Sequence, residues 1–95
     1  MAKKRDRLRI IYDILKAVHD KNNRIKPTHI LYKSNLSHQM MEEYLAELMG
    51  KEFLIENIDK KDNSKTYSLT QKGFDYLNKY KMIAEFTDSF GLEQG

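Results

Sequence analysis

The chain has 95 residues, of which 40% are hydrophobic and 33% charged, and its formal net charge is +3. These values are typical of one small globular domain. The absence of cysteine excludes disulfides, thiolate catalysis and cysteine-bound zinc. No apolar run approaches the roughly 20 residues that cross a bilayer. The charged N-terminus has no apolar segment behind it, so we expect a cytoplasmic protein.

The charge is distributed unevenly along the chain. Residues 1–36 contain ten Lys or Arg and three acidic residues, whereas residues 37–95 contain seven and eleven. Such a division predicts one face that attracts a polyanion and another that serves a different purpose. The alternative is a solvated surface on which charge is merely scattered unevenly.

The first third of the chain predicts two helices. Residues 6–20 place apolar side chains at helical spacing, with Asp6 as the N-cap. The side chains expected on the buried face are Leu8, Ile10, Ile11, Ile14, Leu15 and Val18. Pro27 suits the start of a second helix over residues 28–34, and Asn35 can adopt the left-handed conformation that ends it.

A third helix and a hairpin are predicted next. Ser37 is expected to cap the third helix, which ends at Gly50. Residues 53–59 and 65–70 are short and rich in Ile, Tyr, Thr and Phe, and the polar stretch 60–64 separates them. We therefore expect an antiparallel hairpin.

The last predicted helix begins after Thr70, its N-cap, and runs to about Phe90. Gly73 weakens this helix intrinsically, so we expect it to permit close packing against the hairpin. Phe74 and Leu77 are expected to dock on the hairpin and the first helix. The chain is thus predicted to be α+β and mostly helical.

Three stretches resemble an archaeal winged-helix family in their order and spacing. They are THILYKSNLS at residues 28–37, EYLAELMGKEFLI at residues 43–55 and YSLTQKG at residues 67–73. The resemblance covers about residues 8–77. It implies a winged helix-turn-helix with three helices, a two-stranded wing and a C-terminal fourth helix. Members of this family are small DNA-binding proteins and predicted transcriptional regulators, and in some the last helix pairs with its twin in an antiparallel coiled coil.

The resemblance implies a division of the chain into three parts. Residues 1–9 would form a basic arm that merges into the first helix. Residues 6–72 would form the winged-helix DNA-binding domain. Residues 70–95 would contain the C-terminal helix, which we expect to be a dimerisation element.

The third helix has an acidic face where a helix-turn-helix protein meets DNA. A helical wheel places six side chains in the core: Met40, Met41, Tyr44, Leu45, Leu48 and Met49. The opposite half carries three glutamates. We expect DNA contact mainly at Ser37, His38 and Gln39, beside the free N–H groups of the helix start, with Glu43 as a filter against loose binding. The alternative is a solvated acidic face that makes no contact.

Affinity for DNA is expected to come from basic residues elsewhere. Such residues can lie along a phosphate backbone or enter a minor groove. The arm supplies Lys3, Lys4, Arg5, Arg7 and Arg9, and the wing supplies Lys60, Lys61 and Lys65. Arg24, Lys26 and Lys33 flank the second helix, which crosses the backbone in helix-turn-helix proteins. The alternative is that these clusters only keep the protein soluble.

No catalytic or metal-binding pattern is present in the sequence. His19, His29 and His38 fall in different elements without metal-ligand spacing. No glycine-rich loop could hold a nucleotide. We therefore expect neither an enzyme nor a cofactor.

The last helix carries a second apolar stripe, which we predict to be a homodimer interface. Its members are Tyr76, Tyr80, Ile83, Phe86 and Phe90. Such a stripe would be exposed in a monomer, and exposed apolar patches usually mark interfaces. The alternative is that the stripe folds back onto the first helix.

Two functions are consistent with these features. The first is double-stranded DNA binding by a homodimer, as a transcriptional regulator or a small nucleoid-associated protein. The second is a protein-interaction module whose acidic third helix meets a basic partner. The two differ in where the functional charge lies, because DNA binding uses the arm and wing whereas partner binding uses the third helix.

Overall fold

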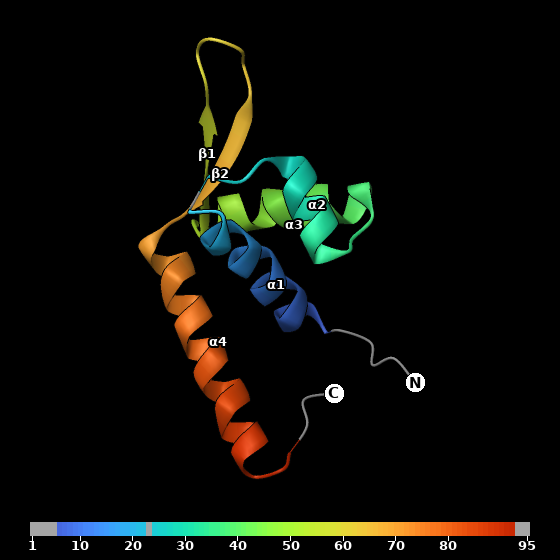
Figure 1. Ribbon diagram of the computed structural model, residues 1–95, viewed down its shortest axis with the longest axis vertical. Coiled ribbons are helices and arrows are strands. Elements are labelled where there is room, and N and C mark those ends of the chain that lie inside the picture. Colours follow the sequence, from blue (N-terminus) through green and yellow to red (C-terminus); the bar gives the residue numbers. More distant parts are fainter. Residues whose placement is uncertain (1–5, 23, 93–95) are drawn as a thin grey trace.

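The computed structural model describes residues 6–22 and 24–92, and these contain the predicted succession of elements (Figure 1). The elements are α1 (Arg7–Asp20), α2 (Pro27–Ser34), α3 (His38–Gly50), β1 (Leu54–Ile58), β2 (Lys65–Leu69) and α4 (Gln71–Ser89). The two strands pair antiparallel. Three helices, a hairpin and a fourth helix are therefore confirmed, and α2 begins one residue earlier than expected.

The starts of α1, α3 and α4 are fixed by the three predicted caps. The side chain of Asp6 accepts from the N–H of Arg9 at 2.8 Å, and Ser37 Oγ accepts from the N–H of Met40 at 3.2 Å. Thr70 Oγ1 accepts from the N–H of Gly73 at 3.1 Å. Each bond satisfies a donor that the first helical turn leaves free. Asn35 ends α2 at φ 54°, in the expected left-handed conformation.

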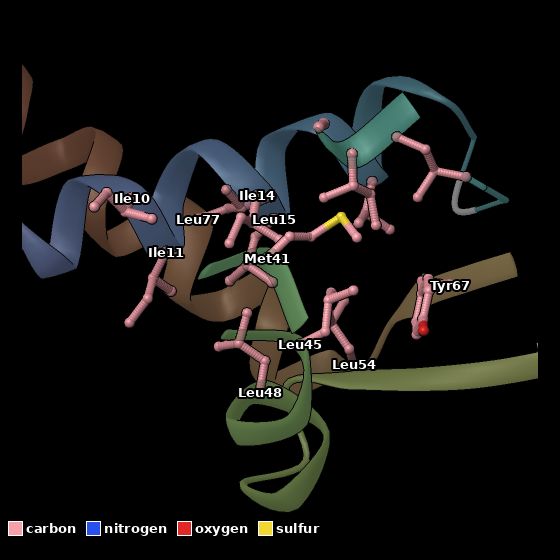
Figure 2. Packing of buried hydrophobic residues seen from close by; sticks show 14 residues of the cluster. Ile10, Ile11, Ile14, Leu15, Met41, Leu45, Leu48, Leu54, Tyr67 and Leu77 are labelled. Atoms are coloured by element: carbon pink, nitrogen blue, oxygen red, sulfur yellow. The ribbon is translucent and has the colours of Figure 1, made fainter. Parts of the chain in front are cut away.

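The core lies between α1, α3 and the base of the hairpin (Figure 2). From α1 it takes Ile10, Ile11, Ile14, Leu15, Ala17 and Val18, and from α3 it takes Met41, Leu45 and Leu48. Ile25, Ile30, Leu54, Tyr67 and Leu77 complete the cluster. Each helix therefore buries one face, as its apolar spacing predicts.

Two residues expected in this core are exposed. Leu8 is 55% exposed and Met40 is 41% exposed, so their assignment to the interior is wrong. Both lie in the first turn of their helix. A helical wheel gives the direction of a side chain, but it does not say whether another element covers that turn of the helix.

Helix α4 begins beside the base of the hairpin, and its C-terminal half extends past the rest of the molecule (Figure 1). The molecule measures 51 × 29 × 21 Å along its principal axes. Leu77 of α4 is buried in the core, as expected. Phe74 is more exposed than expected, and its ring lies 5.8 Å from that of His19 on α1.

Gly73 lies where α4 meets the chain before β1, as the sequence suggested. A Cβ at this position would lie 2.4 Å from the carbonyl oxygen of Phe53. We expect Gly73→Ala to lower the free energy of unfolding by about 1–3 kcal/mol, because backbone must move to admit the methyl group. Gly50 is the matched control, since a Cβ there meets nothing within 4 Å.

Thermal melting should therefore show a lowered melting temperature for Gly73→Ala and no decrease for Gly50→Ala. Gly50→Ala is expected to be neutral or to stabilise by up to about 1 kcal/mol, because alanine restricts the unfolded chain. Equal melting temperatures for both variants would contradict the close approach at Gly73.

Candidate nucleic-acid interface

Helices α2 and α3 are joined by a three-residue turn at residues 35–37. The turn leaves Ser37, His38 and Gln39 exposed at the start of α3, where backbone N–H groups are free of helical partners. On α2, Lys33 is exposed and Tyr32 is 89% exposed. The arrangement offers donors and cations along the outer side of the turn. Tyr32 was not among the expected site residues.

The glutamates of α3 differ in how their charge is compensated. Glu47 pairs with Arg7 at the start of α1, and also with Lys51 at 3.0 Å. Glu43 accepts a hydrogen bond from Gln39 at 3.2 Å, which leaves its negative charge in place. The third glutamate, Glu42, lies 3.6 Å from a nitrogen of His38. The exposed face is therefore acidic mainly along its first two turns.

The two arginines of the arm that the structure describes are both held within the chain. Arg7 lies over the Tyr44 ring, with its Cζ 5.8 Å from the ring centroid, in addition to its pairing with the α3 carboxylate. Arg9 pairs with Asp13 at 3.1 Å and lies over the Tyr12 ring at 5.7 Å. The other predicted arm residues, Lys3, Lys4 and Arg5, lie outside the described residues.

The tip of the wing carries exposed Lys60 and Lys61, and Lys65 begins β2. The neighbouring acids are used to shape the turn. Asp59 accepts from the N–H of Lys61 at 2.8 Å, and Asp62 accepts from the N–H of Ser64 at 3.0 Å. The hydrogen bond from Ser64 lowers the pKa of Asp62, and the nearby positive charge of Lys26 also lowers it. The carboxylates thus have a structural role within the turn.

A contact between the α1–α2 loop and the wing was missed by the sequence analysis. Ile25 forms an antiparallel bridge with Tyr67 of β2, through N–H to carbonyl bonds of 3.3 and 2.9 Å. Arg24 and Lys26 are thereby brought beside the hairpin. An isolated bridge of one residue has no periodicity that a sequence pattern could show.

The side of the wing that faces α3 forms a shallow groove of about 220 Å³. Glu42 of α3 and Glu56 of β1 both line it. The hydroxyl of Tyr67 donates to Glu56 at 3.1 Å. Burial raises the pKa of Tyr67 to about 12, and Glu56 adds to that effect. The groove therefore carries two carboxylates and one cation, Lys65, on walls that are otherwise mostly apolar.

The apolar stripe of α4 is divided by the structure into two parts. Tyr80 is buried with its ring stacked on Tyr12, centroid to centroid at 4.6 Å. Tyr76 donates its hydroxyl hydrogen to the carbonyl of Leu8 at 2.8 Å. The expectation that both tyrosines would be exposed in a monomer is therefore wrong, because α1 covers them.

The second part of the stripe is exposed in the single chain. Ile83, Phe86 and Phe90 are 53%, 60% and 68% exposed. Met82 on α4 and Leu92, which follows the end of the helix, are also exposed, and we call these five residues the distal α4 surface. The rings of Phe86 and Phe90 lie 5.0 Å apart. The part of α4 that extends beyond α1 is thus the part with uncovered apolar side chains.

The described ranges, 6–22 and 24–92, contain neither a metal-ligand cluster nor a membrane-spanning helix. No three His, Cys, Asp or Glu side chains there are grouped so that they could hold a metal ion. Among the same residues, none of the helices is both long and apolar enough to span a membrane.

A helix-turn-helix formed by α2 and α3, followed by a two-stranded wing, defines the winged helix-turn-helix class of proteins. The chain belongs to the winged helix-turn-helix family, whose model matches residues 4–88. The resemblance found in the sequence is therefore confirmed.

One relative is clearly similar in sequence. An uncharacterized protein from Methanocaldococcus jannaschii is 40% identical over 80 residues, which are 84% of this chain and 34% of that protein. The chain thus spans about a third of the length of this archaeal relative.

Two solved structures show the same fold at low sequence identity. Sso10a-2, a DNA-binding protein from Sulfolobus solfataricus, superimposes with a TM-score of 0.77 at 19% identity, over 90% of this chain and 85% of that chain. The MepR–DNA complex from Staphylococcus aureus gives a TM-score of 0.70 at 15% identity, over 84% and 58%. MepR is a transcription regulator of a multidrug efflux pump.

Proposed function

We propose that the protein is a double-stranded DNA-binding homodimer that acts as a transcriptional regulator or a small nucleoid-associated protein. The observation that carries the proposal is the exposed start of α3. Exposed cations lie on α2, which precedes α3, and on the wing, which follows it. The DNA-binding proteins that share the fold support it. Residues 6–72 would bind DNA, and residues 70–95 would join two protomers.

The start of α3 is the part of this helix best suited to an anionic duplex. Its free N–H groups and the positive end of the helix dipole favour a phosphate. Ser37, His38 and Gln39 would make the contacts, and Gln39 could pair with adenine. Glu43 would repel loosely bound DNA, because its carboxylate has no basic partner among the described residues.

The cations would supply most of the affinity. Lys60, Lys61 and Lys65 on the wing would neutralise phosphates, together with Lys33 and the basic arm. Arg7 would have to leave Glu47 in order to do so. The arm would therefore contribute chiefly through the residues that precede Arg7.

Dimerisation would use the distal α4 surface. Residues 82, 83, 86 and 90 fall within about 100° of one another around a helix, which makes one continuous stripe. Burial of a large apolar side chain stabilises by roughly 1.5–3 kcal/mol, so two copies of this stripe would gain substantially by pairing.

A second candidate function is recognition of a basic protein. The observation that favours it is the acidic groove between α3 and the wing, which contains Glu42 and Glu56. Substitution of both by Gln would abolish binding to such a partner. The same change would leave DNA affinity unchanged or raise it, because it removes negative charge.

Salt-titrated binding to mixed-sequence duplex DNA tests the proposed function. If about five phosphates are neutralised per protomer, the logarithm of the binding constant should fall with the logarithm of salt at a slope near −4 to −5. Fluorescence anisotropy across a series of salt concentrations measures that slope. The absence of binding to any duplex at low salt would overturn the DNA-binding proposal.

A further inference from the structure

Helix α4 is attached to the rest of the molecule through its first half only. Its buried residues are Gly73, Leu77 and Tyr80, which all lie within the first ten positions of the helix. The part of the chain that follows Tyr80 extends past the other elements (Figure 1) and carries the distal α4 surface. A change in the angle at which α4 leaves the domain is therefore magnified toward its C-terminal end.

The length of the helix sets the size of this effect. At about 1.5 Å per residue, roughly 18 Å separates Gly73 from Glu85 and roughly 25 Å separates it from Phe90. A tilt of about 10° at Gly73 would therefore move these two positions by roughly 3 and 4.5 Å. In a dimer joined at the distal α4 surface, the same tilt would change the separation of the two winged domains, because each domain lies at the other end of its helix.

Tyr76 lies where α4 meets two other segments of the chain. Its hydroxyl donates to the carbonyl oxygen of Leu8, in the first turn of α1, at 2.8 Å. Its ring meets that of Phe53, just before β1, edge to face with the centroids 5.8 Å apart. Burial raises the pKa of Tyr76 to about 12, so the hydroxyl remains a hydrogen-bond donor well above neutral pH.

The contacts of α4 differ in what they hold in place. The carbonyl of Phe53 accepts from the N–H of Thr70 at 3.1 Å and lies against Gly73, which fixes the base of the helix. One fixed point still allows a helix to tilt. The stacked rings of Tyr80 and Tyr12 can slide over each other at little cost. The hydrogen bond from Tyr76 is directional, so it is the contact that resists tilting.

The turn of α1 that accepts this hydrogen bond also holds α3. Arg7, the residue before Leu8, pairs with Glu47 of α3. Its Cζ also lies 5.8 Å from the centroid of the Tyr44 ring on the same helix. Two neighbouring residues of α1 therefore attach the helix that would meet DNA and the helix that would join two protomers. The direction of α4 is thereby defined relative to α3.

We propose that Tyr76 is a positioning residue for DNA binding, which fixes the angle between α4 and α3 through its hydrogen bond to Leu8. In a dimer joined at the distal α4 surface, this angle sets the distance between the two α3 helices. The inference rests on the proposed function and adds to it the residue that arranges two winged domains for one duplex. Two domains held in a fixed arrangement lose less freedom on binding than two loosely joined ones, and so they bind more tightly.

The variant Tyr76→Phe tests the proposal, because it removes the hydroxyl and keeps the ring. The chain has no cysteine, so spin labels can be attached selectively at Lys61→Cys on the wing and Glu85→Cys on α4, both exposed positions. Pulsed electron paramagnetic resonance then measures the distance between the two labels of one chain, after dilution with unlabelled protein. Tyr76→Phe should broaden the distance distribution by about 3 Å, the displacement expected from a tilt of about 10°.

The matched control is Tyr32→Phe, which removes the same hydroxyl from a residue that is 89% exposed. Its distance distribution should equal that of the wild type. Tyr76→Ala, which removes the ring as well, should broaden the distribution further than Tyr76→Phe. If Tyr76→Phe gives a distribution as narrow as that of the wild type, the proposal is overturned, whether or not Tyr76→Ala folds.

Fluorescence anisotropy with mixed-sequence duplex DNA connects the angle to binding. Tyr76→Phe should lower the affinity roughly three- to tenfold, because the second domain of the dimer is no longer held at a favourable spacing. The salt slope should stay unchanged, because no phosphate contact is lost. An affinity equal to that of the wild type would also overturn the proposal. If the wild type itself binds no duplex, the proposed function fails instead, and the distance measurement still decides whether Tyr76 holds α4.

Discussion

The double variant Ile83→Glu/Phe86→Glu is expected to be a folded monomer, whereas the wild type is expected to be a dimer. Both side chains lie on the distal α4 surface and are more than half exposed in the single chain. Neither belongs to the core formed by α1, α3 and the base of the hairpin. Glutamate at these positions should therefore leave the fold intact while it places like charges in the seam between two helices.

The physical basis is the balance between burial and association. Each large apolar side chain that leaves water contributes roughly 1.5–3 kcal/mol. Association opposes this gain with at least about 4 kcal/mol of lost translational and rotational freedom. The exposed stripe contains Ile83, Phe86 and Phe90 from each protomer, with Met82 beside them, so the gain should exceed the cost.

DNA affinity should fall together with dimerisation. Two linked winged domains bind neighbouring stretches of a duplex at a high effective concentration, and a monomer loses that advantage. Mass by light scattering and binding by anisotropy should be measured on the same sample. Tyr80→Phe is a suitable control, because its ring is buried against Tyr12 within the chain and should not affect mass.

Two results would contradict this dimer. A double variant that remains dimeric would place the interface elsewhere, for example on the exposed face of α3. A wild type that is monomeric at high micromolar concentration would show that the distal α4 surface is not an interface between two copies of the chain.

Leu48→Ala is expected to lower the free energy of unfolding by about 2–5 kcal/mol. Leu48 is almost fully buried between α3 and its neighbours, so the shorter side chain leaves a cavity. In a domain of this size each kcal/mol corresponds to a shift of roughly 4–8 °C in melting temperature. Thermal or denaturant unfolding followed by circular dichroism measures the change directly.

The control for this prediction is Met40→Ala on the same helix. Met40 is substantially exposed, so its truncation should cost much less than that of Leu48. A larger effect at Met40 than at Leu48 would mean that the opposite face of α3 is buried. The glutamates would then have to point inward, against the burial seen in the structure.

Local sequence patterns were sufficient to predict the elements and their ends. Caps at Asp6, Ser37 and Thr70 act within a few residues of themselves, so their hydrogen bonds could be inferred without tertiary structure. The same holds for the left-handed residue Asn35 and for the alternation of the hairpin. Because these short signals also match the pattern of the family, the winged helix-turn-helix fold could be predicted.

The candidate site was predicted less completely, because charge along a sequence does not show which charges meet. Arg7 was expected to contact DNA, yet it pairs with Glu47, which lies forty residues further along the chain. Basic residues of the wing tip were placed correctly, since the turn that carries them is local. The arm residues before Asp6 remain a prediction.

Capping residues, turns and apolar spacing were enough to predict where helices and strands begin and which faces are apolar, and the family resemblance added the winged helix-turn-helix. Which part of each apolar stripe is covered became clear from the folded chain alone. The tertiary structure placed Tyr76 and Tyr80 against α1, left the distal α4 surface bare and joined Ile25 to Tyr67. The physical reason is that capping and periodicity act between near neighbours, whereas burial and charge pairing depend on which segments meet in space.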